Sequence, residues 1–306
     1  MLELMAQPSY RDTYSRFYTY KYKGLVWSLI TFAELCAEAD DQIREMCECL
    51  LVNSREPEYG GFSLNTAQKT GGGRKSEVIP CLTGNLVWVL IHFGYLEDER
   101  LQKAFYHLVE FLILNDGELI ESQVAPYDRF ETCWGSHTCF MGVVKTLKAL
   151  TSVNRELRKE KQQATIDRLV DNLKKAKPGW LHFGFPLMYQ TDVLDILDIL
   201  VREGIHDERM EDAFRLVLQK QNDKGRWLLD NTYASDRLLI PMGNKDEEGK
   251  WITLRSLRVI KGYLQQADAS KVAVHLQFGV IEKGKVVGMN EVVETWDSYI
   301  VASIAQ

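Results

Sequence analysis

Two cysteines and a histidine lie close together in the stretch "ETCWGSHTCFMGVVK", residues 131–145. Cys133, His137 and Cys139 are spaced C-x3-H-x-C, and Cys81 stands at the beginning of another apolar stretch, "IPCLTGNLV". Three thiolates and one imidazole would make a tetrahedral zinc site, because zinc prefers sulfur and nitrogen ligands. Two other interpretations stay open: ordinary buried thiols beside a hydrogen-bonded histidine, and a cysteine nucleophile activated by His137.

Acidic and basic side chains form a second candidate group. The stretch "DVLDILD" repeats aspartate every third residue, which places the carboxylates along one side of a helix. Asp192 comes first, near the expected helix start, and is the candidate general acid or base. Arg255 follows Trp251 by one helical turn and could bind a carboxylate or a diphosphate. Alternatively, Arg255 pairs with Asp192 inside the fold.

Composition excludes several classes of protein. The chain has 306 residues, 45% hydrophobic content and a formal net charge of −6. A basic face is what nonspecific binding to nucleic acid or anionic membrane needs, and the charge balance argues against one. We find no secretory signal and no apolar run long enough for a membrane span. The six cysteines are therefore interpreted as thiols or ligands, and a cytoplasmic location is predicted.

The apolar pattern is helical along most of the chain. Strongly apolar helices are expected at 24–39, 82–95, 139–150, 186–201 and 251–264. A more polar helix follows each of the first four, so buried and half-exposed helices should alternate.

The alternation is an internal repeat. "GYLEDERLQKAF" from Gly94 resembles "GIHDERMEDAF" from Gly204, and Asp98 lies 109 residues before Asp207. Successive apolar helices begin 48 to 65 residues apart, so each repeat is one helical hairpin. Hairpins of this kind must stack to bury their apolar faces, and helices that are apolar nearly all round favour a closed ring over an open solenoid.

The C-terminal region departs from this pattern. Residues 271–280, "KVAVHLQFGV", alternate with a period of two and predict a strand. "EKGK" predicts a turn and "KVVGMNEVV" a second strand. We therefore expect an all-α domain over 1–268 and a small appendage over 269–306, a β-hairpin with a short helix.

Several motifs together resemble one protein superfamily. Gln221, Gly225 and Trp227 in "QNDKGRW" match the Q-x-x-x-G-x-W repeat of squalene and hopene cyclases. "IPCLTGNLV", "HTCFMGVVKTLKAL", "FGFPLMYQTDVLDIL" and "KWITLRSLRVIK" resemble bacterial squalene-cyclase-like proteins. Over about 20–264 the chain resembles the terpenoid cyclase and protein prenyltransferase superfamily. The resemblance implies an α/α toroid with parallel inner helices, an apolar central cavity and an isoprenoid or other hydrophobic substrate.

In such a ring the starts of the inner helices lie at one rim. The resemblance thus implies a site there, with Asp192, Arg255 and Tyr189 as catalytic residues and Asn85, His182, Gln190 and Trp251 as substrate-binding residues. The chain lacks the D-x-D-D acid motif and the D-D-x-x-D magnesium motif of cyclases, and it does not reproduce the zinc motif of prenyltransferases. Two functions stay open: an enzyme acting on a hydrophobic substrate, and a non-catalytic toroid that binds a ligand or a peptide.

Two further segments have local interpretations. The glycine-rich stretch 60–75, "GGFSLNTAQKTGGGRK", is predicted to be a mobile lid. "EADD", residues 38–41, is predicted to form a turn and a helix N-cap.

Overall fold

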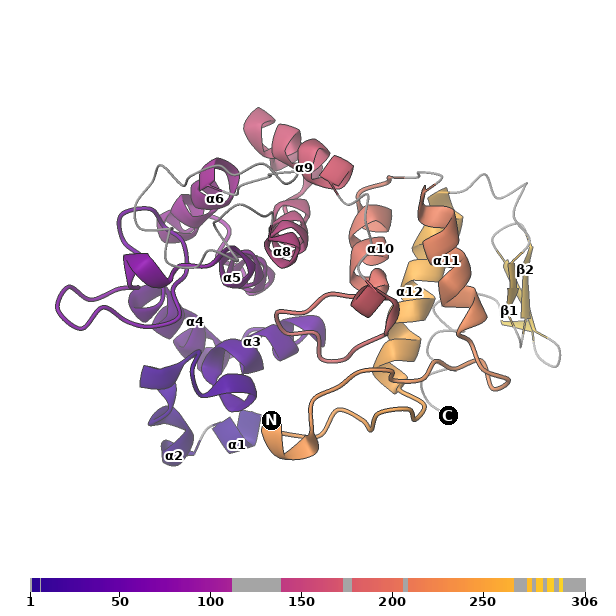
Figure 1. Cartoon of the computed structure of the whole chain (residues 1–306), viewed down its shortest axis with the longest axis horizontal. Coiled ribbons are helices and arrows are strands. Elements are labelled where there is room, and N and C mark those ends of the chain that lie inside the picture. Colours follow the sequence, from indigo (N-terminus) through magenta and orange to yellow (C-terminus); the bar gives the residue numbers. More distant parts are fainter. Residues whose placement is uncertain are drawn as a thin grey trace. The chain divides into compact units, whose positions relative to one another are not determined.

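Helices make up most of the described part of the chain (Figure 1). The computed structural model describes residues 2–5, 7–111, 139–172, 178–205 and 209–266, and four short strands beyond them. The predicted helical class is confirmed. No helix in these residues is both long enough and apolar enough to cross a membrane.

The chain divides into two compact units. Unit 1 comprises Met1–Lys175, Met188–Gln190 and Ala234–Ile240, and unit 2 comprises Ala176–Leu187, Thr191–Tyr233 and Pro241–Gln306. Each unit is described by itself. The predicted boundary at residue 268 stays a prediction.

Unit 1 is built from helical hairpins, as the alternating pattern predicts. Its hairpins are α3 (Leu25–Glu34) with α4 (Asp41–Asn53), α5 (Pro80–His92) with α6 (Glu99–Phe111), and α8 (Phe140–Thr151) with α9 (Glu160–Asn172). Helix α5 contacts both α3 and α8, so these three form an inner layer that is almost wholly buried. Shorter helices complete the unit: α1 (Leu2–Met5), α2 (Pro8–Arg11), η1 (Tyr14–Arg16), η2 (Lys21–Lys23), η3 (Lys75–Glu77), η5 (Arg155–Leu157) and η7 (Ser235–Arg237).

Two glycines let α5 and α8 pack closely together. A Cβ atom on Gly84 would lie 2.5 Å from the carbonyl carbon of Lys145, and one on Gly142 would lie 2.8 Å from Cβ of Pro80. Both distances are shorter than any real Cβ contact, so no larger residue fits without separating the helices.

Helix ends reproduce the predicted repeat. Helices α5 and α10 (Val193–Arg202) are followed by Gly94 and Gly204, with φ of 90° and 68°. The N–H of the residue after each glycine donates to the carbonyl five residues earlier, Tyr95 to Leu90 and Ile205 to Leu200. This is the Schellman ending, which favours glycine because it needs a left-handed residue.

The N-cap predicted in "EADD" is confirmed at the beginning of α4, where the side chain of Asp40 accepts the N–H of Ile43 at 2.8 Å.

Unit 2 contains α10, α11 (Arg209–Gln219), α12 (Lys250–Gln266), η6 (Pro178–Leu181) and a small antiparallel sheet. Helix α10 contacts both α11 and α12. The strands pair in the order β1 (Val274–Leu276), β2 (Gly279–Glu282), β3 (Lys285–Gly288) and β4 (Val292–Val293). Leu276 pairs with Gly279, so the chain reverses between them, where the period-two pattern alone predicts one continuous strand.

The "QNDKGRW" segment forms a tight turn directly after α11. Gln221 bridges to Trp227, whose indole is fully buried and donates to the carbonyl of Val217 at 2.6 Å. The backbone N–H of Trp227 donates to Oγ1 of Thr253, in α12. An equivalent hydrogen bond occurs in unit 1, where the N–H of Phe62 donates to Oγ1 of Thr83, in α5.

The predicted lid at 60–75 is tied into the fold. Thr66 bridges to Gly73, and Arg74 forms an ion pair with Glu77 at 3.1 Å. A Cβ on Gly61 would lie 2.8 Å from the ring of His107, so this end of the segment packs directly on α6. Its mobility stays a prediction.

Candidate functional site

The predicted site residues fall in both units. Unit 1 holds Cys81, Asn85, Cys139, Tyr189 and Gln190, and unit 2 holds His182, Asp192, Trp251 and Arg255. Cys133 and His137 lie outside the described residues.

Asp192 is the N-cap of α10, and its carboxylate is fully hydrogen-bonded. One oxygen accepts the N–H of Asp195 at 2.8 Å and Nη2 of Arg255 at 2.9 Å. The other accepts the N–H of Gly184 at 2.9 Å and Nη1 of Arg255 at 3.0 Å. The side chain is 1% exposed. Four donors occupy the acceptor positions of a carboxylate, so this geometry suits a structural anion better than a proton donor.

Arg255 is committed to the same cluster. Besides Asp192, it donates to the carbonyl of Gly184 at 2.8 Å. Trp251 stacks on Phe185 with ring centroids 5.7 Å apart, and His182 is exposed. The pairing of Arg255 with Asp192, one of the two interpretations open from the sequence, is therefore the one that the contacts favour.

The two described thiols of the predicted zinc set lie at the beginnings of α5 and α8. Cys139 is the N-cap of α8 and accepts the N–H of Gly142 at 3.4 Å. Burial, and to a smaller extent the neighbouring Cys139, raise the pKa of Cys81 to about 12. Within the described ranges no three His, Cys, Asp or Glu side chains form a cluster that could hold a metal ion. The zinc site stays a prediction, because half of its ligands lie outside those ranges.

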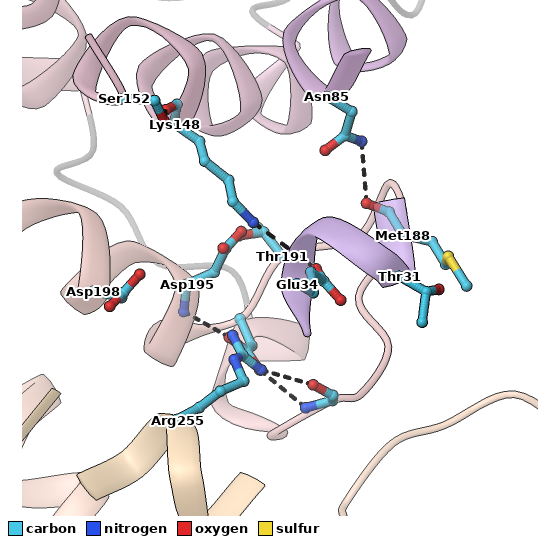
Figure 2. A network of polar contacts seen from close by, with 12 residues as sticks. Thr31, Glu34, Asn85, Lys148, Ser152, Met188, Thr191, Asp195, Asp198 and Arg255 are labelled. Atoms are coloured by element: carbon cyan, nitrogen blue, oxygen red, sulfur yellow. Dashed lines mark hydrogen bonds and ion pairs between the residues drawn. The ribbon is translucent and has the colours of Figure 1, made fainter. Parts of the chain in front are cut away.

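A group of charged and aromatic side chains joins the three inner helices of unit 1. Lys148 of α8 is 5% exposed, and its Nζ lies 3.8 Å from Oε1 of Glu34 at the end of α3. The same ammonium lies 3.8 Å from the ring centroid of Trp88 in α5, a cation–π contact. Figure 2 shows Lys148 extended from its helix toward Glu34.

Asn85 lies one turn before Trp88 and fixes a neighbouring loop. Its Nδ2 donates to the carbonyl of Met188 at 3.1 Å, as Figure 2 shows. Tyr189 follows and packs edge-on against Trp27 of α3, with centroids 5.9 Å apart. Asn85 thus joins the helix that carries Trp88 to the loop that carries Tyr189.

We call this group the inner-helix site. It comprises Trp27, Glu34, Asn85, Trp88, Lys148 and Tyr189. It contains two residues that the sequence interpretation assigned to the site, Asn85 and Tyr189, and two that it missed, Glu34 and Lys148. The sequence does carry one sign of Lys148, because Lys145 and Lys148 interrupt the apolar helix pattern "FMGVVKTLKAL". Both lysines are buried in the structure.

Comparison with known proteins adds no relative. A scan against protein-family models gave no match, and neither did a search of curated proteins.

Proposed function

We propose that this chain is a toroid-type protein of the terpenoid cyclase and protein prenyltransferase kind, which binds an isoprenoid or other hydrophobic molecule among its inner helices. The observation that carries the proposal is the meeting of Glu34, Trp88 and Lys148 from three successive inner helices. A buried ion pair is often less stabilising than an apolar pair of the same volume. Charges kept inside such an apolar layer are therefore a sign of a binding site.

The aromatic side chains support a hydrophobic ligand. Trp27 contacts Tyr189 and also the rings of Tyr18 and Tyr22, at centroid distances of 5.1 and 5.5 Å. The three tyrosines are partly exposed, whereas Trp27 is 1% exposed. Such a cluster offers apolar area with polar edges, as sites for hydrophobic small molecules commonly do.

Binding without catalysis is the second candidate function. The specific observation in its favour is the carboxylate of Asp192, whose oxygens already accept four hydrogen bonds and so offer no free position for a catalytic proton. An enzyme of this fold would need a different proton donor. We therefore propose binding as the primary function, and the identity of the bound molecule would reveal any chemical change made to it.

A zinc ion is compatible with the two described thiols. Cys81 and Cys139 stand at the beginnings of two helices that cross in close contact, and Cys133 and His137 would complete the set. Zinc held there would keep the thiolates ionised and would supply a Lewis acid. The described residues alone do not form the site.

Native mass spectrometry of the purified protein tests the proposal. We expect one hydrophobic molecule per chain, lost when Lys148 and Glu34 are replaced together by Met and Gln. The matched control removes the exposed pair Arg202–Asp198 of α10 in the same way, and should keep the ligand. A wild-type protein that carries no such molecule, and takes up neither farnesol nor squalene when these are added, would overturn the proposal.

A further inference from the structure

We infer that the molecule held at the inner-helix site carries a hydroxyl group, and that Oδ1 of Asn85 accepts its hydrogen bond. The ligand class is then an isoprenoid or long-chain alcohol. The inference rests on the proposed function and names the head group of its ligand.

The orientation of the Asn85 amide is fixed by its partner. A carbonyl oxygen can only accept, so the side of the amide that faces Met188 must be the NH2 group. Oδ1 is then directed away from Met188, as Figure 2 shows. Asn85 therefore presents Oδ1, an acceptor, on the side away from Met188.

That acceptor has no partner among the residues that the structure describes, although Asn85 is only 2% exposed. Buried side-chain oxygens are satisfied in the large majority of cases, so an exception needs a specific explanation. A donor that arrives with a ligand is one such explanation, and the location of Asn85 within the inner-helix site favours it.

The surroundings select an alcohol over an anion. A neutral amide oxygen accepts a hydroxyl proton but repels the oxygens of a carboxylate or a diphosphate. The cation that could attract an anion, Lys148, is already held by Glu34 and by the ring of Trp88. The aromatic rings of the inner-helix site suit the apolar chain that would follow the hydroxyl group.

Three probes of equal chain length test the inference. Dissociation constants are measured for farnesol, for the hydrocarbon farnesene and for farnesyl diphosphate, through quenching of tryptophan fluorescence. The wild-type protein should bind farnesol about tenfold more tightly than farnesene, the usual effect of one buried hydrogen bond. The diphosphate should bind more weakly than the alcohol. These comparisons need no variant.

Two variants test whether Asn85 is the source of the preference for farnesol over farnesene. Asn85→Leu should bind farnesol and farnesene equally well. The control, Ser256→Ala, removes another fully buried oxygen that has no partner among the described residues, in α12, and should keep the tenfold preference. Equal binding of the two probes by the wild-type protein, a preference for the diphosphate, or an equal loss in both variants would overturn the inference.

The two proposals fail in different ways. If native mass spectrometry finds a hydrophobic ligand but farnesol has no advantage over farnesene, only the inference about the hydroxyl group falls. If no hydrophobic molecule binds at all, the proposed function falls and the inference falls with it.

Discussion

Arg255 and Asp192 face each other through two parallel hydrogen bonds of 3.0 and 2.9 Å. The pair joins α12 to the N-terminus of α10, and it is largely buried, with side-chain exposures of 18% and 1%. A bidentate guanidinium–carboxylate pair of this kind has a fixed geometry. Breaking the pair should therefore lower the stability of unit 2.

Replacing Arg255 by Ala should strongly destabilise the fold. The change leaves the carboxylate of Asp192 buried with two of its four donors gone, and breaking a buried pair in this way costs about 3 kcal/mol. The free energy of unfolding in urea measures the effect. Arg202→Ala, which breaks an exposed pair with Asp198 on the same helix, should cost no more than about 0.5 kcal/mol. Similar small losses in both variants would show that the Arg255 pair contributes little.

The stability of unit 1 should depend on pH through His107. Burial lowers the pKa of His107 to about 3, whereas an unfolded histidine titrates near 6.5. Well above pH 6.5 the histidine is neutral in both states and the full stability is present. As the pH falls from 6.5 toward 3, the unfolded state binds a proton that the folded state does not, so stability is lost.

At pH 5 this effect should amount to about 2 kcal/mol relative to pH 7. His107→Gln should lose correspondingly less stability between the two pH values, whatever its stability at pH 7. His182→Gln, at an exposed position, is the control and should behave as the wild-type protein does. An unchanged pH dependence in His107→Gln would contradict the assignment.

Gly84→Ala should separate α5 from α8. The added Cβ would meet the backbone of Lys145 at 2.5 Å, and overpacking of this kind costs about 1–3 kcal/mol. Gly179→Ala is the control, because no atom lies within 4 Å of the position where its Cβ would be. Urea unfolding of both variants provides the comparison. A Gly84→Ala protein as stable as the control would mean that the helices do not pack this closely.

Elemental analysis decides between a zinc site and ordinary thiols. The zinc hypothesis predicts about one zinc per chain, reduced in Cys81→Ser and in Cys139→Ser. Cys36→Ser, at an exposed position, should leave the zinc content unchanged. A wild-type protein without zinc, in which Cys81, Cys133 and Cys139 react readily with an alkylating reagent, would reject the site.

Local features of the fold could be predicted from the sequence. The helical hairpins follow from the 3.6-residue period, and the Asp40 N-cap follows from a short side chain that can accept a backbone N–H. The repeat at Gly94 and Gly204 predicted equivalent helix ends because a left-handed residue favours glycine. Each of these depends on residues close together in the chain.

The contacts of the candidate site could not be predicted in this way. Lys148 and Glu34 are 114 residues apart, and their pairing depends on how α3, α5 and α8 pack. The two alternatives for Arg255 were equally compatible with the sequence, and only the approach of α12 to α10 distinguishes them. Nothing local reveals that Asp192 already has four donors.

Photo-crosslinking with a diazirine-bearing farnesol analogue tests the central claim most directly, because it reports where a hydrophobic ligand lies. We predict that peptides from the inner helices of unit 1 are labelled, namely those containing Leu25–Glu34, Pro80–His92 and Phe140–Thr151. Excess unlabelled farnesol should abolish the labelling. Labelling confined to the outer helices α4, α6 and α9, or labelling that farnesol does not compete away, would contradict a binding site among the inner helices.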